Sequence, residues 1–491
     1  MALRNGINFS NRHLFAILLL ILFLGAIMRF YGLGKENFWI DEGVTVYNAH
    51  QSIIHNFKWS FTLAYLPLYQ MILSAWEKVF GLSEFSMRSL SSVFGILSIF
   101  MIYEIAAFMY GKKVGMYAAL ILALSPFHVY YSQEARVYTL FVFTALISIY
   151  YYLKYIKNHD KKDLIYYIIS SIALLNIFNT AIFILAFQNI HYFLFIRKRI
   201  LKWILTQSFI GLFFLPIFIL TLKMLQVISE SLFVEKPSLM TLAKTFYMFS
   251  AGLTFNTKAL IAGGILSMIF FLLIIYVVKD EIRNMIKKKY KGLEKTSFLV
   301  LWGVFPIFLL SLQSYILTSL YFEKYVIASS AAMYIFAALA ISRLKNSYRI
   351  FALAAIVLLS GVILIIDFKT NNKGDWYGVA NFVKESKNES DGMIINARRS
   401  LYPFMYYFDR NCFESPNLED CAAKQNIYGV LNIGYMPKNA LKNEKIFLLL
   451  YNNEYTDPEG KIVKLLEQDH RITEEKDFQH IKIFVFEKQV T

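Results

Sequence analysis

The residues with the clearest capacity for chemistry are two adjacent carboxylates, Asp41 and Glu42, which follow the first long apolar run of the chain. Phe38 and Trp39 precede this acidic pair and Gly43 follows it. Charged groups at a membrane face are costly, so residues kept there commonly have a function. A carboxylate can accept the proton of a hydroxyl group and so activate it as a nucleophile. The alternative is a solvated loop in which the acidic pair is incidental.

The composition is that of a polytopic membrane protein. Of the 491 residues, 57% are apolar and only 17% are charged, and the mean hydropathy is +0.47. These values exclude an ordinary soluble domain. The formal net charge is +16, but basic residues are not interleaved with a stacking aromatic surface, so we predict no nucleic-acid partner.

Apolar runs close to the ~20 residues that cross a bilayer recur along the chain, and we predict about eleven transmembrane helices. Arg29 directly follows the first run without a small-residue cleavage site, which favours a retained signal anchor. The predicted spans are 14–30, 87–109, 114–131, 138–155, 163–179, 181–196, 203–222, 259–278, 297–315, 325–342 and 350–366.

The distribution of Lys and Arg predicts the orientation in the membrane. Dense basic clusters alternate with sparsely charged loops, and cytoplasmic loops carry the excess of Lys and Arg. We therefore predict a multi-pass protein of the cell (plasma) membrane with a cytoplasmic N-terminus, and with Asp41 and Glu42 outside. The basic clusters lie in residues 112–113, 154–162, 197–202, 279–295 and 343–349.

The chain is expected to contain two domains. Residues 1–366 would form the membrane domain, whose first outside loop, 31–85, includes an interfacial helix over 68–80. Residues 367–491 are polar and read as an extracytoplasmic α/β domain. Its predicted helices are 375–387 and 462–468, and its predicted strands are 392–397, 429–434, 445–451 and 480–486.

The two cysteines, Cys412 and Cys421, both lie in this polar region. A short-loop disulfide fits an oxidising compartment, and two free thiols are equally compatible with the sequence. No Cys or His spacing in the chain is typical of a metal site.

Three further segments are predicted to share the outer face with the acidic pair, namely 65–69, 132–138 and 323–325. Arg136 and Lys324 in these segments could bind a phosphate while a carboxylate performs proton chemistry. The alternatives are structural: Glu134 and Arg136 could form an ion pair that closes a loop, and Arg88 could extend to the interface at a helix start.

Four segments of the chain resemble motifs of a known enzyme family. They are 38–43 (FWIDEG), 87–91 (MRSLS), 124–136 (LSPFHVYYSQEAR) and 373–376 (KGDW). They resemble the polyprenyl-phosphate-sugar-dependent glycosyltransferases of the GT-C superfamily, and in particular the protein O-mannosyltransferase and lipid A aminoarabinose transferase type. The resemblance covers essentially the whole chain.

The resemblance implies a GT-C fold and an inverting transfer of a sugar from a polyprenyl phosphate to an acceptor hydroxyl on a lipid, glycan or protein. Asp41 would be the catalytic base, and Glu42 would support it or help to hold a divalent cation; no cofactor is certain. Arg136, Lys324 and Arg88 would bind the donor phosphate. The expected substrate-binding residues are Tyr65, Tyr69, Gln133, Glu134 and Tyr138.

The sequence departs from the family at Tyr65-Leu66-Pro67, where a basic residue is common, and at Lys324, where Arg is common.

Two other classes of function compete with the transferase. A transporter or flippase of lipid-linked saccharides favours internal repeats and mid-membrane charges, neither of which the sequence indicates. A non-enzymatic envelope assembly protein is the third reading.

Overall fold

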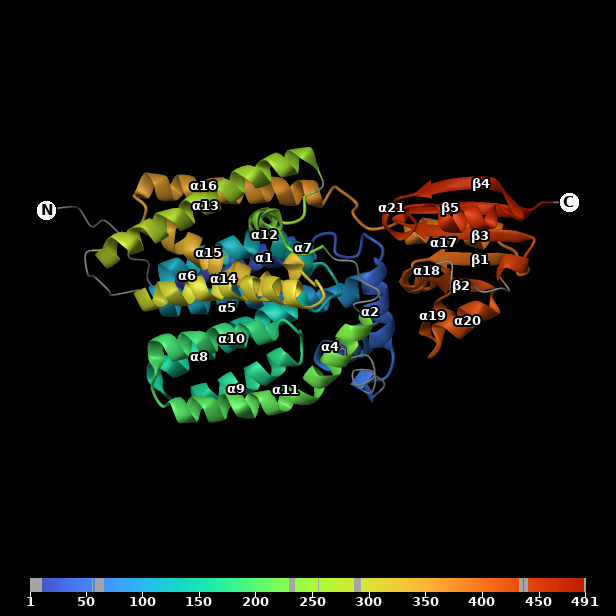
Figure 1. Cartoon of the computed structure of the whole chain (residues 1–491). Helices are drawn as coiled ribbons and strands as arrows, with labels where there is room; N and C mark the ends of the chain where they lie inside the picture. Colours follow the sequence, from blue (N-terminus) through green and yellow to red (C-terminus); the bar gives the residue numbers. More distant parts are fainter. Residues whose placement is uncertain are drawn as a thin grey trace. The chain divides into compact units, whose positions relative to one another are not determined.

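A computed structural model of the protein describes residues 11–54, 56–57, 66–228, 235–254, 256–286, 293–431, 436 and 440–489 (Figure 1). The chain divides into two compact units. The first, here called the helical unit, comprises Met1–Tyr31, Phe57–Tyr69 and Arg88–Thr370. The second, here called the carboxy-terminal unit, comprises Gly32–Asn56, Gln70–Met87 and Asn371–Thr491.

The loop between the first two predicted spans belongs mostly to the carboxy-terminal unit. Its residues 32–56 and 70–87 group with the polar region rather than with the helices, whereas the sequence analysis assigned the whole loop to the membrane domain. The acidic pair, Asp41 and Glu42, is therefore a component of the carboxy-terminal unit.

The helical unit is built from long apolar helices joined by short connections. Its elements are α1 (Asn11–Phe30), α5 (Glu84–Tyr110, which begins in the carboxy-terminal unit), α6 (Lys112–Leu124), α7 (Pro126–Ser132), α8 (Tyr138–Asn158), α9 (Lys161–Leu175), α10 (Ala181–His191), η1 (Tyr192–Ile196), α11 (Ile200–Ile228), α12 (Leu239–Ala251), α13 (Thr257–Ile286), α14 (Leu293–Ile316), η2 (Glu323–Val326), α15 (Ile327–Arg343) and α16 (Asn346–Asp367).

Within the described residues, seven helices are long and apolar enough to cross a membrane, or eight if the bent pair α6–α7 is one span. Every predicted apolar run coincides with a helix. However, α9 has only 15 residues, and the apolar helices Ala181–Ile196 and Ile200–Pro216 are short. A multi-pass helical membrane protein is therefore confirmed, and the count of about eleven spans stays a prediction.

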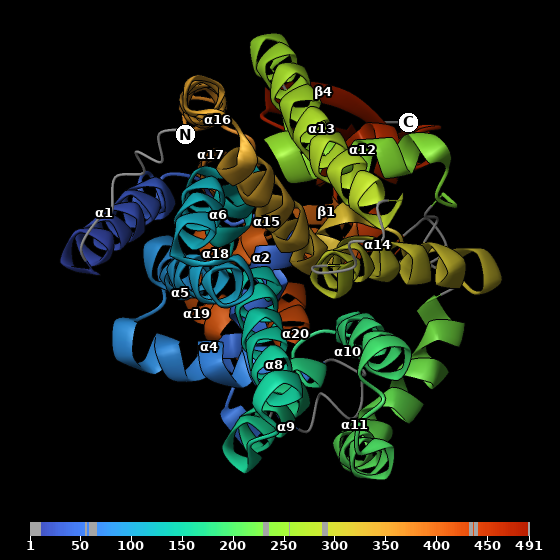
Figure 2. The ribbon, with the colours of Figure 1, turned by 90° about the vertical axis from the view of Figure 1, so that its left-hand side faces the viewer.

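The helix α15 forms the core of the helical unit. Every residue from Ile327 to Ile341 is buried, and the helix packs against α6, α8, α13, α14 and α16. Figure 2 shows α15 with α6, α13 and α16 around it, and α8 to α11 grouped together on another side. Small residues such as Ala331 and Ala332 permit this close packing.

The sharp bend between α6 and α7 is caused by a proline, and an arginine side chain hydrogen-bonds to the carbonyl groups at the bend. The two helices differ in direction by 59°, because Pro126 has no N–H to donate to the carbonyl of Leu122. Arg29, at the end of α1, replaces the missing donors. Its fully buried guanidinium donates to the carbonyl oxygens of Leu122 and Ala123, at 3.1 and 3.0 Å.

The carboxy-terminal unit combines first-loop helices with an α/β fold. The first loop supplies α2 (Ile40–His50) and most of α4 (Pro67–Phe80). The remaining elements are α17 (Trp376–Ser386), β1 (Gly392–Asn396), η3 (Arg398–Ser400), α18 (Leu401–Phe408), α19 (Arg410–Glu414), α20 (Leu418–Lys424), β2 (Ile427–Val430), η5 (Ala440–Lys442), β3 (Lys445–Tyr451), α21 (Asn453–Thr456), α22 (Lys461–Leu466), β4 (His470–Phe478) and β5 (Ile481–Lys488).

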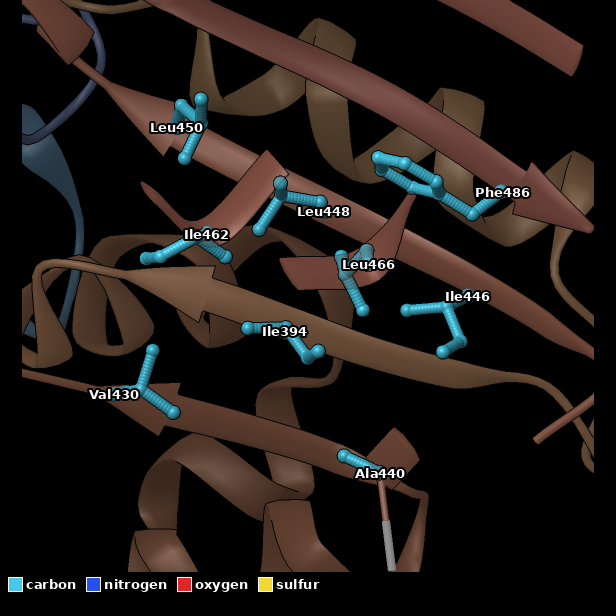
Figure 3. Packing of buried hydrophobic residues seen from close by; sticks show 9 residues of the cluster. All are labelled: Ile394, Val430, Ala440, Ile446, Leu448, Leu450, Ile462, Leu466 and Phe486. Carbon is cyan, nitrogen blue, oxygen red and sulfur yellow. The ribbon is translucent and has the colours of Figure 1, made fainter. Parts of the chain in front are cut away.

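The five strands form one mixed sheet in the order β2-β1-β3-β5-β4 (Figure 1). β1 pairs in parallel with β2 and β3, while β5 is antiparallel to β3 and β4. On one face, Ile394, Leu448 and Phe486 pack with Ile462 and Leu466 of α22 (Figure 3). Alternate residues of β3 face the other side, where Phe447 contacts Phe382 of α17.

The predicted α/β domain is confirmed, although several of its elements differ from the prediction. The strand β4 and the helices α18 to α21 are additional to the predicted elements. Of the predicted strand 429–434, residues 432–435 lie outside the described part of the chain, and the observed strand is Ile427–Val430. Cys412 and Cys421 are joined in a disulfide, which settles the choice that the sequence left open.

Candidate active site

Asp41 and Glu42 occupy the first turn of α2. The helix begins after Trp39, whose backbone N–H donates to Glu42 Oε2 at 3.4 Å. Negative charge is favourable at this end of a helix, because the N–H groups of the first turn carry partial positive charge. Glu42 is fully buried, whereas Asp41 is partly exposed. The two neighbouring carboxylates therefore have different surroundings, and Asp41 has the better access to a substrate.

Glu42 forms a buried ion pair with Lys373, which stands just before α17. The Nζ atom of Lys373 lies 3.1 Å from Glu42 Oε2, and the side chains are 6% and 0% exposed. Charged side chains that are this buried are normally paired, as here. Lys373 is not among the predicted site residues, although it lies in the segment 373–376 that carries part of the family resemblance.

The helix α2 is fixed against α18 by close packing. A Cβ atom on Gly43 would lie 2.7 Å from Pro403 Cδ and 2.8 Å from its nitrogen, so only glycine allows this approach. One turn further on, the Tyr47 hydroxyl hydrogen-bonds to the carbonyl oxygens of Ser415 and Pro416. These contacts attach the helix that carries the acidic pair to the disulfide-containing region.

The residue before Trp39 is anchored through Tyr407 of α18. The backbone N–H of Phe38 donates to the Tyr407 hydroxyl at 2.9 Å, and this hydroxyl donates to Glu84 Oε1 at 2.7 Å. Burial, together with the charge of Glu84, raises the pKa of Tyr407 above its usual range. The hydroxyl therefore stays protonated and keeps donating to Glu84 over the physiological range of pH.

At the other end of α2, His50 pairs with Glu77 of α4. His50 Nδ1 lies 2.7 Å from Glu77 Oε1, and this hydrogen bond raises the pKa of His50 above its ordinary value of 6.5. The folded protein thus holds the proton more tightly than the unfolded chain. This contribution to stability is complete below the unfolded pKa and is lost as the pH rises through the raised folded value.

We therefore expect His50→Gln to lower the unfolding temperature of the purified protein mainly at low pH. The difference from the unsubstituted protein should be largest below the unfolded pKa of 6.5 and should shrink as the pH rises through the raised pKa of the folded protein. Thermal unfolding in detergent at a series of pH values measures this. A difference that is independent of pH would show that His50 contributes by packing alone.

In the helical unit, the structure brings together three of the predicted site residues. The guanidinium carbon of Arg136 lies 5.8 Å from the ring centroid of Tyr138, and Lys324 Nζ lies 5.6 Å from the same centroid. Arg136 comes from the loop between α7 and α8, and Lys324 from η2, so two distant segments place cations at one aromatic ring. Such a pair of cations can bind a phosphate.

The loop that carries Arg136 is held by hydrogen bonds at both ends. Ser91 Oγ donates to the carbonyl oxygen of Arg136, and Ser92 Oγ donates to that of Ser132. The side-chain amide of Gln133 donates to backbone carbonyls at the end of α1, including that of Tyr31 at 2.9 Å. Gln133, a predicted substrate-binding residue, thus fastens this loop to α1.

The remaining predicted phosphate-binding and substrate-binding residues differ in burial and in whether the structure describes them. Glu134 is 2% exposed, Arg88 1% and Tyr69 3%, so all three are buried within the helical unit. Tyr65 lies outside the described residues. In the neighbouring η2, Glu323 pairs with Lys244 at 3.1 Å.

A metal site is not evident in the described part of the chain, where no group of three or more His, Cys, Asp or Glu side chains is arranged to hold an ion. The cation next to Glu42 is the ammonium group of Lys373. The predicted alternative role of Glu42, to help hold a divalent cation, stays a prediction.

Residues 66–223 match the model of the family described as dolichyl-phosphate-mannose-protein mannosyltransferase. The matched segment includes Arg88, Arg136 and Tyr138, but not Asp41 or Lys324. No curated protein matches the sequence.

Several solved structures share the fold. ArnT from Cupriavidus metallidurans in the apo state is 11% identical, with a TM-score of 0.57 over 97% of this chain and 98% of ArnT. The apo oligosaccharyltransferase of Archaeoglobus fulgidus is 12% identical, with a TM-score of 0.56 over 91% of this chain and 71% of its own. ArnT bound to undecaprenyl phosphate has a TM-score of 0.53 at 10% identity, over 95% of this chain and 97% of its own.

Proposed function

We propose that this chain is a membrane glycosyltransferase of the GT-C type, which transfers a sugar from a polyprenyl phosphate to an acceptor hydroxyl group. The family match over residues 66–223 and the fold shared with ArnT and the Archaeoglobus oligosaccharyltransferase support this proposal. The sugar is a hexose or a pentose, and the acceptor is a lipid, a glycan or a protein. The reaction takes place at the extracytoplasmic face of the cell membrane, with inversion at the anomeric carbon.

In this reaction Asp41 accepts the proton of the acceptor hydroxyl while the hydroxyl oxygen attacks the anomeric carbon. The bond between that carbon and the phosphate oxygen breaks, and its electron pair leaves with the polyprenyl phosphate. Arg136 and Lys324 stabilise the charge that develops on the departing phosphate. Glu42 supports Asp41, Arg88 assists with the phosphate, and Tyr65, Tyr69, Gln133, Glu134 and Tyr138 contact the substrates.

The observation that carries the proposal is the position of Arg136 and Lys324 at the ring of Tyr138, at 5.8 and 5.6 Å. The ligands of similar proteins support a polyprenyl-phosphate donor. ArnT has been solved with undecaprenyl phosphate, and the Archaeoglobus oligosaccharyltransferase with an inhibitory peptide and a dolichol-phosphate. The disulfide of the carboxy-terminal unit supports an oxidising, extracytoplasmic location for Asp41.

The test uses the full-length protein reconstituted in liposomes with synthetic polyprenyl-phosphate sugars carrying mannose, aminoarabinose or galacturonic acid. Mass spectrometry follows the release of polyprenyl phosphate, and membrane extracts of the host serve as acceptors. Release that depends on the acceptor supports the proposal. Movement of the intact donor across the bilayer without bond cleavage would instead indicate a flippase, and contradict it.

A further inference from the structure

We propose that Lys373 is a positioning residue for the transfer reaction, through which the segment before α17 sets the orientation of the Asp41 carboxylate. The inference rests on the proposed function and deepens it, because it names a residue that acts on the catalytic turn of α2 without touching a substrate. Lys373 acts through Glu42, the neighbour of Asp41.

The burial of the pair is the first argument. Lys373 and Glu42 are 6% and 0% exposed, so both charges have lost nearly all contact with water. The attraction in such a pair commonly does no more than offset the cost of desolvation, and well-packed apolar residues often give equal or better stability. A gain in stability therefore does not explain why an ion pair is buried here. A need to hold the first turn of α2 in one orientation does explain it.

The geometry around Glu42 is the second argument. Its Oε2 atom accepts both from the Trp39 backbone N–H, at 3.4 Å, and from Lys373 Nζ, at 3.1 Å. The first contact belongs to the N-terminus of α2 and the second to a segment more than 300 positions further along the chain. One carboxylate thus joins the start of α2 to the segment before α17, and Asp41 is the adjacent residue in that turn.

The segment that carries Lys373 is itself fixed on both sides. On the side of the first loop, Glu36 Oε1 accepts from the Asn372 N–H at 2.7 Å, and Asn37 Nδ2 donates to Asp375 Oδ1 at 3.4 Å. On the side of the sheet, the Trp376 ring stacks on Tyr451 with centroids 5.4 Å apart. The ammonium group is therefore held in place by contacts independent of the ion pair.

The segment also packs closely at Gly374, where an added side chain would crowd its neighbours. A Cβ atom on Gly374 would lie 3.2 Å from Tyr451 Cε2 and 3.2 Å from Ile481 Cδ1. Burial raises the pKa of Tyr451, on whose ring Trp376 stacks, and the charge of Asp41 adds to this effect.

The experiment is a kinetic double-mutant cycle on the full-length protein in liposomes. Lys373→Met is expected to lower kcat by about 10–100-fold, since a displacement of about 1 Å can cost that much. The KM for the donor should change by less than about twofold, because the substitution leaves the phosphate-binding residues intact. Lys373→Arg should recover most of the kcat, because it keeps the positive charge.

The double-mutant cycle then tests whether Lys373 acts by positioning Glu42 or in another way. If Lys373 acts through Glu42, Lys373→Met should cause no further loss of kcat in a Glu42→Gln background. This double variant has no unpaired buried charge, so it is expected to fold even if Lys373→Met alone does not. Lys482→Met is the matched control, because Lys482 pairs with Glu475 on the exposed surface of the same unit; its kcat should equal that of the unsubstituted protein.

Two results would overturn the inference while leaving the proposed function intact: an unchanged kcat in Lys373→Met, or an additional loss of kcat when Lys373→Met is combined with Glu42→Gln. A rise in KM as large as the fall in kcat would indicate a direct role in donor binding and would also contradict it. An unsubstituted protein that releases no polyprenyl phosphate would overturn the proposed function itself.

Discussion

Asp41→Asn is expected to reduce kcat for sugar transfer by about 10²–10⁴-fold, the range that a well-placed base contributes. Asparagine has nearly the same shape as aspartate, and the hydrogen bond that Thr45 Oγ1 donates to residue 41 goes to its backbone carbonyl. The first turn of α2 should therefore survive the substitution, while the group that accepts the proton is lost. Release of polyprenyl phosphate in the liposome assay measures kcat.

Asp477→Asn provides the control, because Asp477 is a 72% exposed residue on the edge strand β4. It should retain full activity. The unfolding temperature of Asp41→Asn should remain within a few degrees of that of the unsubstituted protein. Full transfer by a correctly folded Asp41→Asn, or by Asp41→Ala, would show that Asp41 is not the base.

Arg136→Ala should lower kcat by about 10²–10³-fold, which is typical for the loss of one group that stabilises a developing negative charge. The KM for the donor should rise as well, since the guanidinium also holds the phosphate before reaction. Lys324→Ala should have a similar but smaller effect, because an ammonium group makes fewer directional hydrogen bonds than a guanidinium. Initial rates over a range of donor concentrations separate the two parameters.

The two cations lie at one ring, so their effects should not be independent. The double variant Arg136→Ala/Lys324→Ala is expected to lose less than the product of the single losses, as for other residues that act on one group. Lys258→Ala, an exposed lysine of the same unit, should have no effect. Arg136→Ala with unchanged kinetics would leave only a structural role in the loop for this residue.

Most of the fold could be predicted from the sequence where buried residues create a hydrophobic run or period. All predicted apolar runs are helices, and the strands β1, β3 and β5 match predicted strands because their side chains are mostly buried and β-branched or aliphatic. The strand β4 was missed because it is an edge strand whose residues are mostly exposed and charged, and such a sequence has no hydrophobic period. Its structure depends on hydrogen bonds to β5, which the local sequence does not reveal.

Only part of the candidate active site could be predicted from the sequence. Sequence reasoning selected Arg136, Lys324 and Tyr138, and the structure places them together. It did not select Lys373, because an isolated lysine before a helix resembles any solvated lysine until its partner is known. The segment 373–376 was noted as a motif, but pairing with Glu42 is a long-range contact.

The buried guanidinium of Arg29 has a consequence for biogenesis. During synthesis, α1 leaves the ribosome long before Leu122 and Ala123 exist, so this charge must wait for its acceptors. The hydrogen bonds of this guanidinium thus depend on a segment more than 90 positions further along the chain. The end of the first helix and the bend between α6 and α7 therefore reach their final arrangement together.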